Sequence, residues 1–297
     1  MKRLSIIIVT YKSEHDIYDC LKTVWDYCDI PKDELEVIIV DNSPECEPMF
    51  SKLRTLYGND ITLIHNTHNG GYGQGNNIGI REAKAPIILI MNPDVRLFEP
   101  IGKIAVEAFE KDKKLSIYGM KQMQSATEMS PTSFFCSYMM NGYLFTILTG
   151  LCNRFDLYLP KYMYFSGSCF FIRKDMFESI GLFDESIFMY GEEDDVRWRM
   201  MEKFGSHFKY NKHLHYIHPM LDRPPNINYE KKLLEVAMTQ NEKKGYSRKK
   251  TLRNRMQNFR MLILRERLRK CFGKANLARL AMYEDFYGFM KEQNCML

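Results

Sequence analysis

A strand-like apolar run that ends in Asn-Pro-Asp offers the clearest opportunity for chemistry in this sequence. Residues 87–91 are all apolar, and Asn92, Pro93 and Asp94 follow directly. Such a run predicts a strand buried on both faces, which the proline ends because it has no N–H to donate. Asp94 would then lie at the carboxyl end of a central strand, where open α/β sheets bind ligands. A carboxylate there suits Mg²⁺ or Mn²⁺ carrying a diphosphate, although the tripeptide alone is also a common turn.

Polar residues also end the first two strand-like runs. Thr10 and Tyr11 close the run that begins at Leu4, and Asp41 closes the run that begins at Glu36. In a parallel sheet these ends face the same crevice as Asp94. Asp41 stands where acidic residues accept hydrogen bonds from nucleotide groups, and a turn or helix-capping role explains it equally well.

A glycine-rich segment follows the third strand-like run. Residues 69–79 read Asn-Gly-Gly-Tyr-Gly-Gln-Gly-Asn-Asn-Ile-Gly, which predicts a loop whose backbone N–H groups approach phosphate or ribose, and then a helix. The segment is not a dinucleotide fingerprint, because it follows the wrong strand and Asn76 stands where a glycine is required. It is not a P-loop either, since no Gly-Lys-Ser/Thr follows. A plain connecting loop is the alternative.

Four adjacent carboxylates, residues 192–195, begin a predicted helix that runs to Phe204. Neighbouring carboxylates repel one another and raise the pKa of at least one of them, which suits a general base working near neutral pH. The first turn of a helix also attracts acids through its dipole. An ordinary acidic helix start is therefore the competing interpretation.

These residues need a scaffold, and the chain alternates strand and helix signals in the pattern of a mostly parallel α/β sheet. Strands are expected over 4–11, 36–41, 61–66, 87–91, 116–120, 165–172 and 213–217, and helices over 14–28, 45–57, 74–84, 99–111 and 193–204. Residues 222–225, Asp-Arg-Pro-Pro, break this pattern, and the chain beyond them is polar and helix-prone.

Composition and charge narrow the class of protein. The 297 residues are 45% hydrophobic and 27% charged, which argues for a folded globular protein, and the eight cysteines show no zinc spacing and read as reduced cytosolic thiols. The net charge of +5 is unevenly spread: residues 243–274 contain thirteen Lys or Arg and one acid, which leaves the rest at −7. Nucleic acid and an anionic membrane surface are the two candidate partners for such a segment.

Residues 129–153 contain no charged side chain. A membrane-spanning helix needs about 20 predominantly apolar residues, and polar residues interrupt this stretch too often. We therefore expect a buried or interfacial helix and not a span. The apolar run of residues 4–9 is too short for a signal peptide, so we expect a first strand.

Taken in order, these motifs resemble those of the inverting family 2 glycosyltransferases, which have a GT-A-type fold. The resemblance covers roughly residues 3–221 and rests on residues 5–11, 40–43, 69–79 and 92–94, and on the block formed by 166–173, 181–185 and 190–193. The nearest likeness is the rhamnosyltransferase-like branch of bacterial O-antigen and capsule synthesis. It implies a GT-A-like catalytic domain at 1–221 and a basic helical C-terminal extension at 222–297.

The resemblance also implies roles for the motif residues. Nucleobase contacts are implied for Thr10, Tyr11 and Asp41, and ribose and phosphate contacts for Asn69, Gly71, Gly75 and Asn76. Asn92 and Asp94 occupy the Asp-X-Asp motif, with Asp94 as the metal-binding member and Asn92 in place of the first aspartate. His218 matches a metal- or phosphate-proximal histidine, and a merely structural role beside the strand-like run of residues 213–217 is the alternative. Glu193 occupies the position of the catalytic base, and Glu192 and Asp195 remain alternatives.

The implied activity is inverting transfer of a sugar from a nucleotide donor, a dTDP- or UDP-sugar such as dTDP-rhamnose, to a glycan or lipid-linked acceptor in surface polysaccharide synthesis. We expect a cytoplasmic enzyme that associates peripherally with an anionic membrane through residues 243–274, with the uncharged stretch 129–153 also approaching the bilayer. We expect it to bind no nucleic acid and to be able to form a homodimer. One alternative is a nucleotidyltransferase acting on sugar phosphates, which should show a glycine-rich loop directly after the first strand; residues 10–14 contain no glycine. The other is a nucleic-acid-binding protein that uses the basic segment.

Overall fold

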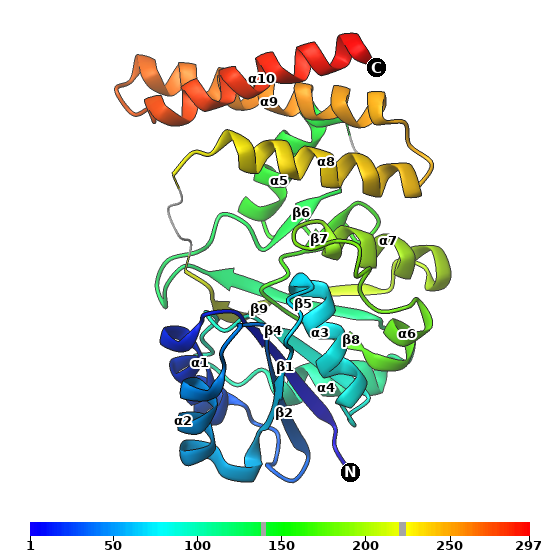
Figure 1. Ribbon diagram of the computed structural model, residues 1–297. Helices are drawn as coiled ribbons and strands as arrows, with labels where there is room; N and C mark the ends of the chain where they lie inside the picture. The colour runs from blue at the N-terminus through cyan, green and yellow to red at the C-terminus, as the bar shows by residue number, and fades with distance from the viewer. Residues whose placement is uncertain (138–140, 220–223) are drawn as a thin grey trace. The chain divides into compact units, whose positions relative to one another are not determined.

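The computed structural model describes residues 1–137, 141–219 and 224–297 (Figure 1). They fall into two compact units. Unit 1 comprises Met1–Ser133 and Phe165–Met220, and unit 2 comprises Phe134–Tyr164 and Leu221–Leu297. Residues 222 and 223 of the predicted break, and 138–140 of the uncharged stretch, lie outside the described residues. The division into domains 1–221 and 222–297 stays a prediction, and unit 2 also takes in residues 134–164.

Unit 1 is built on a seven-stranded sheet in the order β3-β2-β1-β4-β8-β5-β9. The strands are β1 Leu4–Thr10, β2 Leu35–Asp41, β3 Thr62–His65, β4 Ile87–Met91, β5 Ile117–Met123, β8 Cys169–Arg173 and β9 Phe208–Ile217. All pairs are parallel except the two that β8 makes, with β4 and β5. The expected mostly parallel α/β sheet is confirmed, and the antiparallel direction of β8 was not predicted.

The helices of unit 1 are α1 Glu14–Tyr27, α2 Glu47–Tyr57, α3 Gly71–Glu82, α4 Gly102–Lys111, α6 Lys174–Ser179 and α7 Glu192–Phe204, with a short 3-10 helix, η1, at Gly58–Asp60. The apolar side of α1, with Ile17, Leu21 and Val24, is buried in the same core as strands β1 and β2. Burying such a stripe against a sheet is what holds an amphipathic helix in place.

The glycine-rich segment is helical three residues earlier than predicted, because α3 begins at Gly71. Its glycines are buried where the helix packs on the sheet. A Cβ at Gly75 would lie 2.7 Å from Val9 Cγ1, and one at Gly79 would lie 2.6 Å from Ile7 Cγ2. The absence of side chains lets α3 approach β1 this closely. That packing outweighs the low helix propensity of glycine, on which the expected loop rested.

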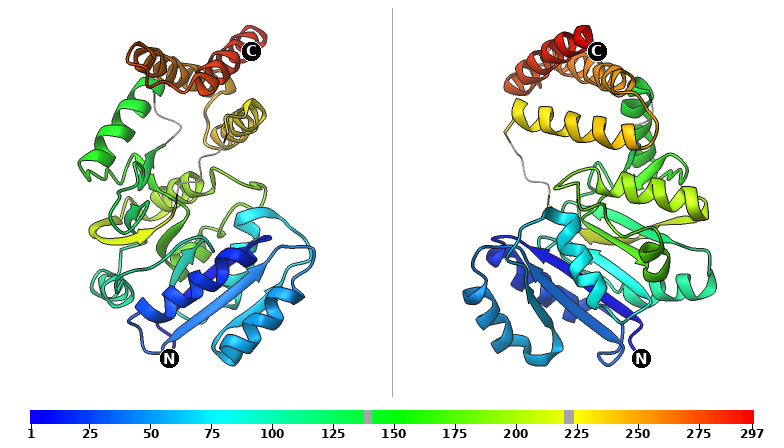
Figure 2. Two further views of the ribbon diagram at one scale, coloured as in Figure 1. Left: turned by 90° about the vertical axis from the view of Figure 1, so that its left-hand side faces the viewer. Right: turned by 45° about the vertical axis from the view of Figure 1, so that its right-hand side comes forward.

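Unit 2 joins the C-terminal helices to the segment inserted between β5 and β8. It contains α5 Gly142–Arg154, α8 Ile227–Lys243, α9 Arg248–Cys271 and α10 Leu277–Met296. It also contains β6 Phe134–Cys136, which pairs with β7 Met163–Phe165; the last residue of β7 belongs to unit 1. Helices α9 and α10 lie side by side (Figure 2) and share a core that includes Phe259, Phe286 and Met290. The expected helical C-terminal region is confirmed. Within the described ranges, no helix has the length and hydrophobicity needed to cross a bilayer.

Candidate functional site

The ends of β1 and β2 hold a buried carboxylate in a fixed orientation. The parallel register places Thr10 opposite Asp41. The Thr10 hydroxyl donates to Asp41 Oδ1 over 2.7 Å, and the Ser43 hydroxyl donates to the same oxygen over 2.9 Å. Asp41 is 1% exposed, and its other oxygen, Oδ2, has no hydrogen-bond partner among the described residues. An oriented acceptor of this kind can receive an N–H group from a ligand.

A cavity of about 360 Å³ lies beside this carboxylate. Asp41 and Ser43 line it, together with Lys12, Ser13, Glu14, Pro44, Glu45, Pro48 and Met49. Tyr11, at the start of the same loop, is 48% exposed, with the Lys12 ammonium 5.5 Å from its ring centroid. The cavity thus offers a carboxylate, hydroxyls and an adjacent aromatic ring, groups that recognise planar polar ligands.

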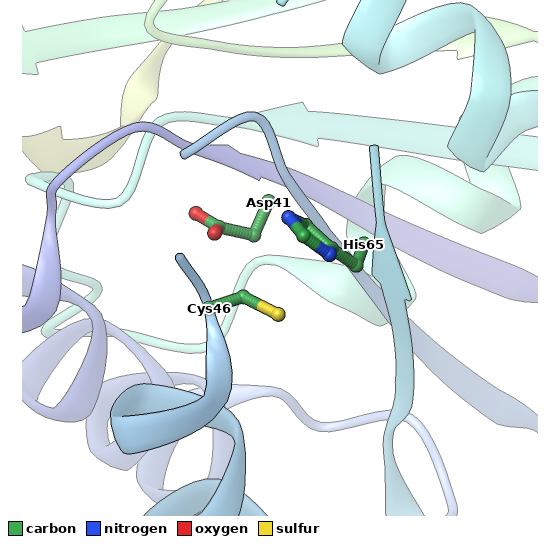
Figure 3. Close-up of side chains that lie close together, drawn as sticks. All are labelled: Asp41, Cys46 and His65. Atoms are coloured by element: carbon green, nitrogen blue, oxygen red, sulfur yellow. The ribbon is translucent and has the colours of Figure 1, made fainter. Parts of the chain in front are cut away.

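Asp41 also forms a cluster with Cys46 and His65 that the sequence analysis missed (Figure 3). One ligand atom from each lies within 4.8 Å of the others, which is close enough for a cation. However, the Asp41 carboxylate points away from the His65 ring, and burial raises the pKa of the Cys46 thiol. The His65 Nε2 atom is engaged by the Ser43 carbonyl oxygen at 2.9 Å. The three residues lie on separate elements and have no metal-binding spacing, so only the fold brings them together.

Asp94 follows β4 as predicted and meets His218, which follows β9. Asp94 Oδ2 lies 3.3 Å from His218 Nε2. Burial acts to raise the pKa of Asp94, but the hydrogen bond to His218, together with the backbone and the charge of Arg96, outweighs it, so the pKa lies below its usual value. Asp94 Oδ1 and His218 Nδ1 have no hydrogen-bond partner among the described residues. An ionised carboxylate and an imidazole with unused ligand atoms fit a divalent cation.

Asn92 is fixed by its backbone at the same strand end. Its N–H donates to the Ser168 carbonyl over 2.8 Å, and its own carbonyl accepts from Val95 over 3.2 Å. The side chain is half-buried. Asn92 therefore shapes the turn that presents Asp94.

The glycine-rich segment forms the buried start of helix α3 and not an open loop. Asn69 Oδ1 accepts from the Gly71 N–H over 3.1 Å, and Gly71 has a φ of +91°, where a Cβ would meet the Phe188 carbonyl. Gly75 and Asn76 are buried, and the Asn76 amide donates to the Tyr72 carbonyl over 2.9 Å. Asn76 Oδ1 has no hydrogen-bond partner among the described residues. The contact of these residues with ribose or phosphate stays a prediction.

The four carboxylates at the start of α7 differ in whether they have an arginine partner. Asp194 pairs with the Arg197 guanidinium at 3.1 Å, and Asp195 accepts from Arg199 Nε over 2.7 Å. Glu192 and Glu193 form no ion pair among the described residues. The paired carboxylates stabilise the helix start, and the other two are free to titrate.

Burial distinguishes these two glutamates further. Glu192 is 1% exposed, and its burial, reinforced by the charge of Glu193, raises its pKa to about 9. Burial raises the pKa of Glu193 to about 7, with hydrogen bonds from the backbone of Glu193 and Gly167 acting in the opposite direction. At neutral pH Glu192 is therefore protonated, while Glu193 can both accept and release a proton. That is the property of a general base.

Gly167 and Tyr72 hold Glu193 in place, and the sequence analysis assigned no role to either. A Cβ at Gly167 would lie 1.8 Å from Glu193 Oε1, so only glycine lets the carboxylate rest there. The Tyr72 hydroxyl donates to the Gly167 carbonyl over 2.6 Å, and the Tyr72 N–H donates to the Phe188 carbonyl over 3.1 Å. In the sequence, the available signal for this role was that Tyr72 is the single aromatic residue within the glycine-rich segment 69–79. Through Tyr72, α3 is tied both to Gly167, which contacts the base, and to Phe188, in the segment that precedes α7.

The sequence is similar to a known protein family and to characterised proteins. The family model for glycosyl transferase family 2 matches residues 5–181. The low-salt glycan biosynthesis hexosyltransferase Agl10 of Haloferax volcanii is 31% identical over 211 residues, which are 66% of this chain and 61% of that protein. The poly(ribitol-phosphate) beta-N-acetylglucosaminyltransferase TarS of Staphylococcus aureus is 28% identical over 96 residues, 32% of this chain and 16% of that protein. The chain thus spans less than two thirds of the length of either relative.

Two solved structures share the fold. The mannosyltransferase PcManGT from Pyrobaculum calidifontis, in complex with GDP-Man and Mn2+, has a TM-score of 0.57 at 15% identity, covering 97% of this chain and 69% of its own. S. aureus TarS 1-349, in complex with UDP-GlcNAc, has a TM-score of 0.55 at 14% identity, covering 98% and 92%. At these identities the likeness is one of fold.

Proposed function

Because the chain belongs to glycosyl transferase family 2, we propose that it transfers a sugar from a nucleoside diphosphate sugar to an acceptor hydroxyl with inversion at the anomeric carbon. The observation that carries the proposal is Glu193, a carboxylate with a pKa raised to about 7 that is held against Gly167, beside neighbours that are paired or protonated. The buried Asp41 and the Asp94–His218 pair, at strand ends of the same unit, supply groups for the donor.

The nucleobase would bind at the ends of β1 and β2. Asp41 Oδ2 has no protein partner among the described residues and would accept an N–H from the base, while Thr10 and Ser43 keep the carboxylate oriented. The exposed ring of Tyr11 lies next in the chain after Thr10, where it can stack on a planar base. This assignment uses the Asp41 cavity for the nucleoside and not for a cation.

Asp94 and His218 would hold a divalent cation, Mg²⁺ or Mn²⁺, and Asn92 would present Asp94. The unpartnered Asp94 Oδ1 and the imidazole beside it favour this pair over the Asp41, Cys46 and His65 cluster, whose carboxylate points away from His65. A cation there would offset negative charge on the departing diphosphate.

Glu193 would accept the proton of the acceptor hydroxyl. The acceptor oxygen then forms a bond to the anomeric carbon while the bond from that carbon to the diphosphate oxygen breaks, and the diphosphate leaves with the electron pair. Attack from the opposite face inverts the configuration. Glu192, protonated at neutral pH, adds no second negative charge beside the base.

For the donor we propose a dTDP- or UDP-sugar, with dTDP-rhamnose one member of the set. The acceptor would be a glycan or lipid-linked saccharide of a surface polysaccharide, used at the cytoplasmic face of a membrane by a peripherally bound enzyme. A homodimer stays a prediction. A nucleotidyltransferase is disfavoured by the family, and nucleic-acid binding is disfavoured because Arg248, Arg255 and Arg267 pair with glutamates of α8 and α10.

A donor screen tests this function. The chain is incubated with UDP-, dTDP- and GDP-sugars, with and without Mn²⁺, and release of nucleoside diphosphate and transfer to saccharide acceptors are measured. We expect one nucleoside class to support turnover in the presence of the cation. Failure of every nucleotide sugar to bind or react would contradict the proposal.

A further inference from the structure

Helix α5 in unit 2 exposes a row of apolar side chains. Leu144, Ile147, Leu151 and Phe155 are each between 44% and 60% exposed. Their spacing of three, four and four residues puts the first three on one side of α5. Phe155, directly after the last residue of the helix, continues the same side. These four residues make up the α5 face. The only charged residue of the helix is Arg154, at its end.

The opposite side of α5 is already occupied. Gly142 packs so closely on α9 that a Cβ would lie 1.8 Å from the Asn254 carbonyl oxygen. Thr146 Oγ1 accepts from the Asn258 amide over 2.8 Å. Helix α5 is thereby held on α9 in one rotation about its axis. The α5 face points away from that contact, so the fold of unit 2 itself keeps it exposed.

The residues that follow α5 in the chain also expose apolar and aromatic side chains. Leu157, Leu159 and Tyr162 are also exposed. The Arg154 guanidinium lies 5.8 Å from the Phe155 ring centroid, and the Lys161 ammonium lies 5.8 Å from that of Tyr162. Apolar residues flanked by aromatic and basic ones are typical of segments that lie at a bilayer surface.

The charge of unit 2 indicates what covers this face. By sequence, unit 2 carries 20 basic and 9 acidic side chains, a net charge of +11, while unit 1 carries 22 and 28, a net charge of −6. A second copy docking by the same face would bring two units of +11 together, whereas an anionic lipid surface would attract the unit. Charge complementarity therefore favours a bilayer over a second copy.

We propose that the α5 face inserts into the interfacial region of an anionic membrane. The proposal deepens the proposed function, since it names the surface on which a lipid-linked acceptor is met. Of the two segments expected to approach the bilayer, it assigns insertion to the uncharged one, through the α5 face. The basic segment 243–274 does not insert, since Arg248, Arg255 and Arg267 are paired with acids of unit 2. The net positive charge attracts the unit to the surface, and the α5 face provides the insertion.

Vesicle sedimentation with the full chain tests this proposal. We expect binding to phosphatidylcholine vesicles that contain phosphatidylglycerol. Binding should weaken roughly tenfold or more in Ile147→Asp/Leu151→Asp, because two exposed apolar side chains that would enter the membrane are replaced by charges. Leu56→Asp/Ile104→Asp, which changes two similarly exposed apolar residues of α2 and α4 in unit 1, is the matched control and should bind as the unaltered chain does.

A fluorescent reporter separates insertion from attraction by charge alone. Tryptophan emission of Ile147→Trp should shift to shorter wavelength with anionic vesicles, and that of Leu56→Trp should not. Equal vesicle binding by the double aspartate variant, or no shift at position 147, would overturn the proposal. So would an unaltered chain that dimerises in solution through a contact that the double variant loses, because a second copy would then cover the face.

The vesicle measurements do not depend on catalysis. Glu193→Gln should bind vesicles like the unaltered chain, whatever its activity. Vesicle binding without any glycosyl transfer would leave this inference standing and reject the proposed function, and transfer to a soluble acceptor without vesicle binding would do the reverse.

Discussion

The acidic start of α7 and the basic length of α9 are both runs of one charge in the sequence, but the structure uses them differently. In α7 the four carboxylates lie at a helix start in unit 1, where Glu192, Asp194 and Asp195 are buried and only two of the four have arginine partners among the described residues. In α9, exposed arginines such as Arg267 pair with glutamates of neighbouring helices. Burial without a partner changes the pKa of a carboxyl, whereas an exposed pair leaves the chemistry of both groups ordinary.

This difference shows which charges can carry a reaction. Burial raises the pKa of Glu193 to about 7, and Gly167 and Tyr72 hold the residue in this half-buried position, with no cationic partner among the described residues. The arginines of α9 contribute charge to the whole of unit 2 and ion pairs to its helices. We therefore expect substitutions around α7 and Asp94 to change turnover, and substitutions in α9 to change mainly stability.

The largest effect is expected at Asp94. Asp94→Ala should reduce glycosyl transfer to background, because it removes the ionised ligand that faces the diphosphate, and the fold should remain intact since the side chain is only half-buried. Turnover by the unaltered chain should likewise stop in chelator and return with Mg²⁺ or Mn²⁺. Glu284→Gln, which removes an exposed and paired carboxylate in unit 2, is the control. An active Asp94→Ala enzyme would remove the cation from the mechanism.

Gly167→Ala should have the next largest effect. The added Cβ would overlap Glu193 Oε1 and displace the base, and a misplacement of about 1 Å can cost roughly a hundredfold in rate. Steady-state kinetics should show a fall in kcat with little change in KM for the donor. Gly288→Ala, in α10 where a Cβ meets open space, should leave turnover unchanged. Equal activity of the two variants would mean that Gly167 does not position the base.

Glu192 predicts a dependence of stability on pH. Its pKa is raised to about 9 in the folded chain, so its favourable contribution is fully present below the unfolded pKa and is lost as the pH rises through about 9. Urea denaturation of the unaltered chain should therefore show less stability at high pH than near pH 5. Glu192→Gln cannot ionise and should show a smaller decrease. Parallel pH profiles for the two chains would contradict the assignment of Glu192 as a buried, protonated carboxyl.

The smallest effect is expected in α9. Arg267→Ala breaks an exposed pair with Glu284 and should change the free energy of unfolding by about 0–1 kcal/mol. Turnover with a soluble acceptor should be unaffected. A loss of activity comparable to that of Gly167→Ala would mean that the basic helix takes part in the reaction, and the contrast between the two charge runs would then fail.

Much of unit 1 could be predicted because local patterns decide it. The apolar run 87–91 became β4 with the same bounds, since a short run of buried residues that ends at a proline suits the interior of a sheet. The glycine-rich segment could not be predicted as a helix, because its stability comes from close packing on Val9 and Ile7 and not from its own propensity. The antiparallel direction of β8 could not be predicted either, because the apolar pattern of a strand does not specify whether it runs parallel or antiparallel to its neighbours.

Long-range contacts set the limits on predicting the site. The sequence located the strand-end Asp94 and the acidic run, but only the fold shows that His218 lies 3.3 Å from Asp94 and that Gly167 lies against Glu193. Glu192 and Glu193 are adjacent and identical in type, so burial alone separates them. The joining of residues 134–164 to the C-terminal helices had no local signal either, because it depends on contacts such as Thr146 with Asn258.

The most direct test of the account compares Glu193→Gln with Glu192→Gln in one assay, with donor affinity measured by calorimetry alongside turnover. Glu193→Gln should bind the nucleotide sugar like the unaltered chain and lose roughly two to four orders of magnitude in turnover, the usual contribution of a general base. Glu192→Gln should lose far less, because its carboxyl is already protonated at neutral pH. A larger loss in Glu192→Gln would reassign the base by one residue, and full activity in both variants would reduce the acidic run to an ordinary helix start.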